Sequence, residues 1–198
     1  MITLNRVLRC LLVILAATLP AQAVKGEGSG WSLLQLINEI GGVEVRTSRF
    51  TETKEIAILN TSLIQTGTID FQYPDKLIKR FDPPNSTVIE IEGDRLSILL
   101  PTKQPHYLSI SNNPQLAALL DPIRAVMAGD IMTLRRYYQI TLKGEKARWQ
   151  IELLPRDRTV ARRISGIEIF GAGPTINRYQ VIEQNGDRTT TNLELVGD

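Results

Sequence analysis

The residues best suited to acid–base or nucleophilic catalysis at neutral pH are a single histidine, His106, and a single cysteine, Cys10. His106 stands three residues before Ser109, so a serine nucleophile activated by a histidine base is the chemistry this pair could support. The surrounding Pro-His-Tyr-Leu-Ser segment has the pattern of a strand start and lacks the Gly-x-Ser-x-Gly motif of a nucleophile elbow. We therefore expect a structural or surface histidine, no catalytic residue and no enzyme; an exported hydrolase is the disfavoured alternative.

Other patterns that could bind a cofactor are equally weak. The glycines between Gly166 and Gly173 are not followed by Lys-Ser/Thr and do not open a helix, so they predict a turn rather than a nucleotide loop. One cysteine and one histidine exclude a disulfide framework and a Cys/His zinc site. The acid pairs Glu90/Glu92 and Asp70/Asp75 are typical of the solvated face of strands. The sequence predicts no metal and no cofactor.

The first 23 residues change the charge of the protein. Arg6 and Arg9 precede a short apolar run, and Ala21-Gln22-Ala23 matches a signal-peptidase site. The apolar run is well short of the ~20 residues that cross a bilayer, so we expect a cleaved signal peptide at 1–23 rather than an uncut anchor. Cleavage leaves 175 residues (198 − 23), no cysteine, and a net charge of zero (+2 − 2). An exported protein is implied, and nothing supports binding to nucleic acid.

The sequence of the mature chain predicts many strands and few helices. Residues 24–30 form a glycine-rich leader, and residues 31–40 predict a helix that Gly41-Gly42 ends. Periodicity predicts a helix over 114–128 that Pro122 breaks or kinks near Leu120, and a second helix from Asp130. Period-two alternation predicts strands at 47–59, 62–71, 77–81, 87–92, 95–100, 138–143, 147–154, 164–170, 176–183 and 188–196, with a further strand starting near 106.

These strands follow one another at hairpin spacing, without helical crossovers. We therefore expect one mainly β domain over 31–198, built on an antiparallel sheet of about eleven strands. A sheet this wide twists and curls, which creates a concave face for the few helices to cover. Either side chains fill that concavity, or it keeps an apolar cavity under a helical lid; the sequence leaves both alternatives open.

The succession of local patterns resembles the LolA family of periplasmic lipoprotein carriers and their LolA-related relatives. The resemblance extends from Trp31 to about Leu195. It includes Phe50-Thr-Glu, the run from Gly67 to Asp75, Val88-Ile-Glu-Ile-Glu-Gly-Asp-Arg-Leu-Ser-Ile, Gly129-Asp130, Trp149-Gln-Ile-Glu-Leu-Leu-Pro and Gly186-Asp-Arg-Thr. The resemblance implies an unclosed antiparallel barrel of eleven strands with a helical lid over a hydrophobic cavity.

The candidate ligand-binding residues belong to the cavity wall and the lid. The family's aromatic on the early strand matches Phe50, and one face of the 114–128 helix carries an apolar stripe. The full set is Phe50, Phe71, Tyr73, Ile89, Ile91, Leu96, Ile98, Leu116, Leu119, Leu120, Ile123, Met127, Leu134, Trp149 and Ile151.

Tyr73 departs from the family pattern. Family carriers typically have an arginine before the proline of this strand turn, and here Tyr73 precedes Pro74. A phenol donates one hydrogen bond and carries no charge, so Tyr73 would hold a lid less tightly than arginine and let cargo exchange faster. Alternatively, Tyr73 only packs beside Pro74 at a strand end.

The resemblance implies a monomeric periplasmic carrier in a Gram-negative envelope. Its cargo would be an acylated lipoprotein or another lipid, taken from an inner-membrane donor and delivered toward an outer-membrane acceptor. No nucleotide motif is present, so affinity differences or other components would drive the transfer. The alternative is a non-catalytic interaction or assembly protein on the same scaffold, with a filled cavity.

The first prediction concerns processing. We expect the exported protein to begin at Val24, because the only good small-x-small site after the apolar run ends at Ala23. N-terminal sequencing of the protein from the periplasmic fraction tests this. Recovery of most molecules with an intact Met1 would show that the segment is not cleaved.

Overall fold

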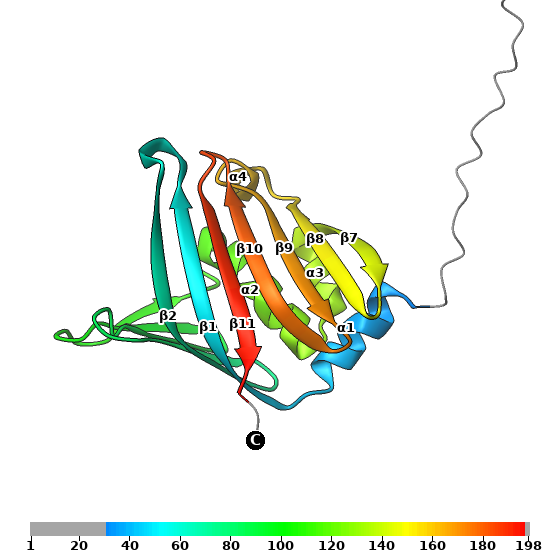
Figure 1. The fold of residues 1–198 in the computed structure, drawn as a ribbon, viewed down its shortest axis with the longest axis horizontal. Coiled ribbons are helices and arrows are strands. Elements are labelled where there is room, and N and C mark those ends of the chain that lie inside the picture. The colour runs from blue at the N-terminus through cyan, green and yellow to red at the C-terminus, as the bar shows by residue number, and fades with distance from the viewer. Residues whose placement is uncertain (1–30, 197–198) are drawn as a thin grey trace, which may run out of the picture. The chain divides into compact units, whose positions relative to one another are not determined.

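Eleven antiparallel strands form a single open sheet in the computed structural model, which describes residues 31–196 (Figure 1). The strand order is β6-β5-β4-β3-β2-β1-β11-β10-β9-β8-β7, so β1 (Val45–Ile56) and β11 (Arg188–Leu195) pair in the middle. The two free edges are β6 (His106–Ser109) and β7 (Tyr138–Glu145). The prediction of an unclosed antiparallel sheet of about eleven strands is confirmed. The predicted signal peptide and leader lie outside the described residues.

The other strands complete two wings, one on each side of the central pair. Each strand hydrogen-bonds to the next strand in sequence, except that β6 does not pair with β7. In addition, the first strand, β1, pairs with the last strand, β11. Their bounds are β2 Thr61–Gln72, β3 Lys76–Phe81, β4 Val88–Glu92, β5 Arg95–Leu99, β8 Arg148–Pro155, β9 Ile164–Ala172 and β10 Thr175–Glu183.

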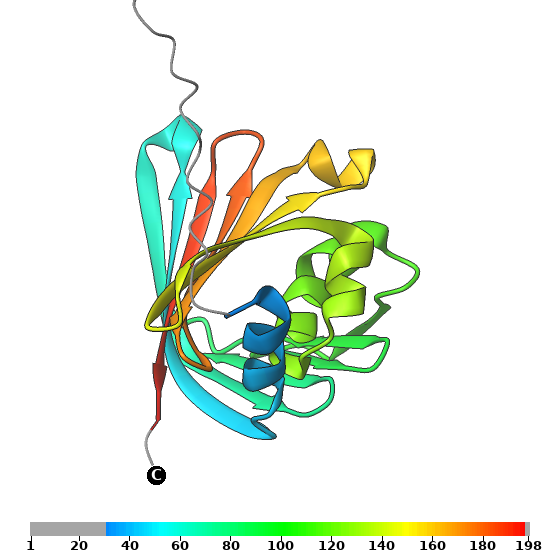
Figure 2. The same cartoon turned by 90° about the vertical axis from the view of Figure 1, so that its right-hand side faces the viewer.

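The helices gather on the concave side of the curved sheet. Figure 2 shows α1 (Leu33–Gly41), α2 (Pro114–Ala128) and α3 (Ile131–Tyr137) enclosed by the strands. A four-residue helix, α4 (Arg158–Ala161), joins β8 to β9. None of the helices that the structure describes combines the length and the apolar composition needed to cross a bilayer.

Helix α1 begins at Leu33, within two residues of the predicted start, and both hydrogen bonds of a capping box stabilise its N-terminus. The Ser32 hydroxyl accepts from the Gln35 N–H, and the Gln35 side chain accepts from the Ser32 N–H. Its apolar face, Leu36, Ile37 and Ile40, is fully buried. Burial of this face, rather than intrinsic propensity, is what holds so short a helix against the sheet.

Of the break or kink predicted at Pro122, the break is wrong, because α2 runs without interruption from Pro114 to Ala128; the kink stays a prediction. A proline inside a helix removes one ladder hydrogen bond, but the buried position of Pro122 lets tertiary packing offset that loss. The predicted end is confirmed: Gly129 closes the helix with a φ of 76°, which favours glycine. Asp130 then caps α3 by accepting from the backbone N–H groups of Met132 and Thr133, and the hydrogen bond from the Thr133 hydroxyl is the main cause of its lowered pKa.

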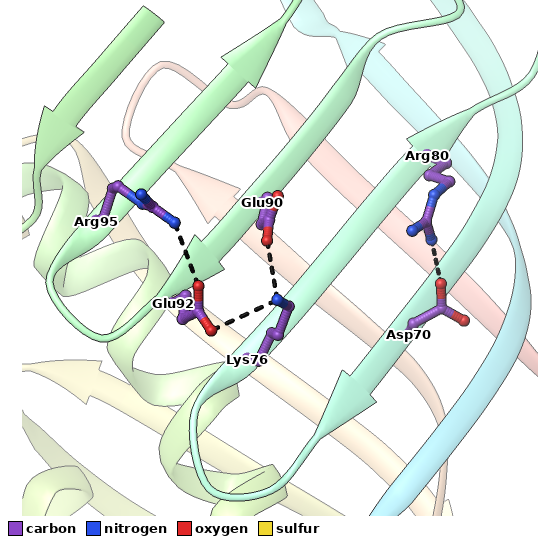
Figure 3. Close-up of polar contacts among 6 residues, drawn as sticks. All are labelled: Asp70, Lys76, Arg80, Glu90, Glu92 and Arg95. Atoms are coloured by element: carbon purple, nitrogen blue, oxygen red, sulfur yellow. Dashed lines mark hydrogen bonds and ion pairs between the residues drawn. The ribbon is translucent and has the colours of Figure 1, made fainter. Parts of the chain in front are cut away.

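Charged residues lie on the opposite, convex face of strands β2 to β5, as predicted for Asp70, Glu90 and Glu92. The prediction is wrong for Asp75, which lies in the β2–β3 turn and pairs with Arg124 of α2. Figure 3 shows Lys76 between Glu90 and Glu92, at 3.2 Å and 3.4 Å, and Arg95 at 3.2 Å from Glu92. Arg80 and Asp70 form a further pair on the same face. Solvent screens such exposed pairs, so they mark the solvated face more than they stabilise it.

Two short elements were not predicted. The expected strand 47–59 ends at Ile56, and residues Ala57–Leu59 form the 3₁₀ turn η1 of the β1–β2 hairpin. The helix α4 is capped by Asp157, which accepts from the backbone N–H groups of Thr159 and Val160. A single turn of helix has no periodicity to read, so only the capping residue could have indicated it.

The second prediction concerns the close contact at Gly67. Gly67 pairs with Phe50 across the β1–β2 ladder, and a methyl group added there would meet the carbonyl of Arg80 and lie 2.6 Å from the Phe50 ring. We expect Gly67→Ala to lower the free energy of unfolding by about 1–3 kcal/mol, the usual cost of overpacking. Urea denaturation measures this change.

The matched control is Gly166→Ala, another buried strand glycine. A methyl group at Gly166 would lie 3.4 Å from its two nearest neighbours, so we expect a smaller loss than at Gly67. Equal losses in the two variants would contradict the role assigned to the Phe50–Gly67 contact.

Candidate functional site

Two hydrophobic clusters occupy the concave side of the sheet, one under each wing. The first packs α1 and α3 against β7, β8 and β9, with Trp149 and Tyr138 as its largest buried side chains. The second packs α2 against β1 to β5, around Phe50 and Phe71. Side chains therefore fill much of the concavity, and the space left over lies between the clusters.

That space is a cavity of about 560 Å³ roofed by α2. Its volume falls within the roughly 300–1,000 Å³ typical of small-molecule sites. The apolar residues that line it come from both wings and from the helix: Val43, Ile69, Leu77, Ile91, Leu120, Ile123, Val126, Met127, Ile169, Ile176, Tyr179 and Leu193. The cavity can therefore accept an apolar group without desolvating many polar atoms.

Exposed side chains border one end of the cavity. Val45 at the start of β1 is 64% exposed, and Leu195 and Val196 at the end of β11 are also exposed. The N–H of Val196 donates to the carbonyl of Thr47 at 3.0 Å, which joins the two sides of this rim. We take this end as the mouth of the cavity, since lining residues are exposed there.

A cation lines the cavity next to the mouth. Arg46 is two residues before the buried Ser48 and four before Phe50, so strand alternation places it on the concave face. Its Nη2 donates to the carbonyl of Ile40 in α1. Its Nη1 is buried and has no hydrogen-bond partner among residues 31–196. Burial lowers the pKa of the guanidinium.

A second arginine lines the cavity from α2, the helix that roofs it. Arg124 of α2 lies 3.5 Å from Asp75 in the β2–β3 turn and 3.5 Å from Asp121 on its own helix. Its Nε is buried without a partner in the described part of the chain. Burial raises the pKa of Asp121, although Arg124 opposes that shift. Two acids thus offset the charge of Arg124, whereas no carboxylate in the described part of the chain pairs with Arg46.

A further ion pair lies on the concave face, away from the cavity lining. Lys79 and Glu52 meet at 2.5 Å, with side chains that are only 12% and 14% exposed. The ammonium lies 4.5 Å from the centre of the Phe50 ring, and the Thr191 hydroxyl donates to Glu52 at 2.9 Å. This pair is satisfied within the protein and has little capacity left for a ligand.

The sequence match decides the family. The model of LolA-like outer membrane lipoprotein carrier proteins matches residues 21–196. The chain belongs to this LolA-like family. The resemblance drawn from the local sequence patterns is therefore confirmed.

Solved structures with a similar arrangement are distant from this LolA-like chain. A LolA superfamily protein from Nitrosomonas europaea is 14% identical, with a TM-score of 0.46 over 83% of this chain and 92% of that one. A DUF1329 family protein from Desulfovibrio piger is 13% identical, with a TM-score of 0.48 over 81% and 89%. The lipoprotein LppX of Mycobacterium tuberculosis is 11% identical, with a TM-score of 0.36 over 82% and 95%. No curated protein matches the chain.

The structure places the candidate LolA-like site residues in four different surroundings. Four of them line the cavity: Ile91, Leu120, Ile123 and Met127. Six pack in or against the cluster beside it: Phe50, Phe71, Ile89, Leu96, Ile98 and Leu116. Three lie in the other cluster, in the far wing: Leu134, Trp149 and Ile151. Tyr73 lies outside both clusters, and the side chain of Leu119 is outside what the structure describes.

Several lining residues were not predicted from the sequence. Ile69 is two residues before Phe71 on β2, and Leu77 is the direct partner of Phe71 on β3. Period-two alternation along the two strands could therefore have predicted both. Strand alternation could also have placed Arg46 on the concave face with Phe50. Nothing in the local pattern around Arg124 distinguishes it from an exposed helical arginine, because its environment is created by the distant turn at Asp75.

A second cavity lies at the other end of the concavity. Its volume is about 630 Å³, and α2, α4, β9 and β10 contribute to its lining. The candidate residue Leu116 lines it together with Val160, Ile164 and Val181. Arg163 and Glu183 also border this space, so it is less uniformly apolar than the first cavity.

The possible catalytic pair does not assemble. His106 is exposed on the edge strand β6, and strand alternation points Ser109 to the opposite face. The Ser109 hydroxyl donates to Asp94 at 2.7 Å, which anchors the segment entering α2. Within residues 31–196, no group of three or more His, Cys, Asp or Glu side chains is placed to hold a metal ion.

The third prediction concerns Tyr73. Its side chain is 53% exposed in the β2–β3 turn and is not among the cavity-lining residues. We expect Tyr73→Ala to change the dissociation rate of a bound fluorescent fatty acid by no more than about twofold, as for an ordinary surface substitution. Stopped-flow dilution into vesicles measures the rate. Release that is tenfold faster would support a lid-holding role for this tyrosine instead.

Proposed function

We propose that the mature chain is a periplasmic carrier that shields the acyl chains of a lipoprotein or another lipid during transport toward the outer membrane. The observation that carries this proposal is the apolar cavity between α2 and the two wings of the sheet. Membership of the LolA-like carrier family supports it. The proposed role is non-catalytic and uses no cofactor.

The energetics explain why such a container is useful. Each methylene group moved out of water is worth about 0.8 kcal/mol, so an acyl chain crossing an aqueous compartment is strongly disfavoured without a shield. A cavity lined by residues such as Ile69, Ile123 and Met127 offsets that cost. The carrier needs no energy source of its own if the inner-membrane donor binds the lipid less tightly, and the outer-membrane acceptor more tightly, than the carrier does.

Two features support binding rather than a purely structural role. The wings are already packed by their own clusters, so the central cavity is not required to complete the core. The net charge of the predicted mature chain is zero, which disfavours adhesion to anionic membranes on the way. An interaction or assembly protein on the same scaffold is the alternative outcome of the tests below.

Co-purified lipid is the direct test. The protein is purified from the periplasm without detergent, extracted with organic solvent and examined by mass spectrometry. We expect stoichiometric lipid or acylated peptide in the extract. Extracts without lipid, together with a protein that takes up no hydrophobic dye, would favour the interaction protein.

The fourth prediction concerns the apolar face that α2 turns toward the cavity. Ile123 of α2 lines the cavity, so Ile123→Asp places a carboxylate in an apolar wall. We expect the affinity for a neutral hydrophobic dye to fall at least about tenfold, because an apolar ligand would have to desolvate that carboxylate. Dye fluorescence measures the affinity, and circular dichroism checks that the variant is folded.

The matched control is Met132→Asp in α3. Met132 is 71% exposed and does not line the cavity, so its replacement adds the same charge without touching the site. We expect unchanged dye affinity. A folded Ile123→Asp variant that binds dye as well as the control would argue that the α2 stripe is a fixed part of the core.

A further inference from the structure

We infer that the cavity takes an amphiphile with an anionic head group, and that Arg46 binds the head while the apolar wall holds the chain. This inference rests on the proposed carrier function and names its cargo class: lipids that bear a phosphate or carboxylate, rather than neutral lipids.

The first argument is the missing counter-charge of Arg46. Within the described residues, no carboxylate lies within 4.0 Å of its guanidinium, although eleven other ion pairs are formed. Its Nη1 is buried with no acceptor among these residues. An ionised group removed from water is costly unless an anion pairs with it. The structure thus offers an N–H donor and a positive charge to something outside the chain.

The second argument is position. Arg46 follows Val45, which borders the mouth, and precedes the wall of the cavity on the same strand. Direct cross-strand neighbours lead from Arg46 to Phe71, Leu77 and Ile91, and the last two line the cavity. A ligand whose charged end meets Arg46 would therefore extend its chain along apolar side chains.

The third argument is the contrast with the other concave-face charges. Glu52 and Lys79 neutralise each other, and Arg124 is offset by Asp75 and Asp121. Arg46 is then the uncompensated charge at this cavity. The unpartnered Nε of Arg124 adds a donor but no net charge. A single anionic group is consistent with this arrangement.

The test compares two lipids that differ only in a phosphate group at one end. 1-Myristoyl lysophosphatidic acid and 1-monomyristoylglycerol share the chain and the glycerol, and each displaces a neutral hydrophobic dye from the wild-type protein. We expect the phosphate lipid to bind about tenfold more tightly, the size expected of a charge-assisted hydrogen bond. Inorganic phosphate alone should not displace the dye at the same concentrations, because the site needs the chain.

Variants assign the preference to one side chain. Arg46→Gln should bring the two lipids to similar affinities by weakening only the phosphate lipid, and Arg46→Lys should restore part of the preference. The matched control is Arg178→Gln: Arg178 also has a buried, unpartnered Nε among the described residues, but it stacks on Phe170 at 4.0 Å. Its sequence neighbour Tyr179 lines the cavity, so alternation places Arg178 on the other face, and its replacement should leave the preference intact.

The outcomes separate this inference from the proposed function. Equal affinity of the wild-type protein for the two lipids would overturn the anionic head-group site and leave the lipid carrier standing, even if Arg46→Gln failed to fold. Persistence of the preference in folded Arg46→Gln, or displacement by phosphate alone, would also overturn the site. Failure of both lipids and of the dye to bind would instead reject the carrier.

Discussion

The pairing of the first strand with the last is the constraint on which the architecture depends. Because β1 and β11 are central neighbours, the chain must build one wing outward to β6 and then start the other wing from its far edge at β7. The segment that joins the two edges has to cross the concave side. That segment contains α2 and α3, so the same topological step that opens the sheet also covers it.

This arrangement explains why a cavity remains between two well-packed regions. Each wing curves toward the helices and packs its own cluster, around Trp149 in one and Phe50 in the other. A single helix, α2, cannot fill the space between two diverging surfaces with its one apolar stripe. The remaining volume is lined by both wings and lies where β1 begins and β11 ends.

The charges on the concave face show two different solutions to the same physical problem. Glu52 and Lys79 are satisfied by each other, by Thr191 and by an aromatic ring, so they behave as part of the scaffold. Among residues 31–196, the hydrogen-bond partner of the Arg46 guanidinium is one backbone carbonyl, that of Ile40. Arg46 is half-buried, and holding a cation partly out of water without an anion is unfavourable in the free protein.

The sequence predicted the fold better than the site, for a physical reason. Alternation and caps are local, so the strands and the Gly129-Asp130 junction could be predicted from the sequence. At Pro122 the sequence left a break and a kink open, and tertiary packing keeps the helix continuous there. Alternation also gives the face of a strand but not what covers that face. Phe71 and Ile69 share the concave face and the same hydrophobic cluster, yet Ile69 lines the cavity and Phe71 does not. The charge environment of Arg124 depends on residues 49 positions away and had no local signature.

The free edges of the sheet also have a mechanical consequence. A closed barrel has a radius fixed by its strand number and shear, so its interior cannot swell without breaking the ladder. Here β6 and β7 are not bonded to each other, and the sheet can flatten or curl by small changes in twist at each strand pair. Its curvature is therefore an elastic variable, and the volume enclosed by the sheet can change while every strand keeps its partner.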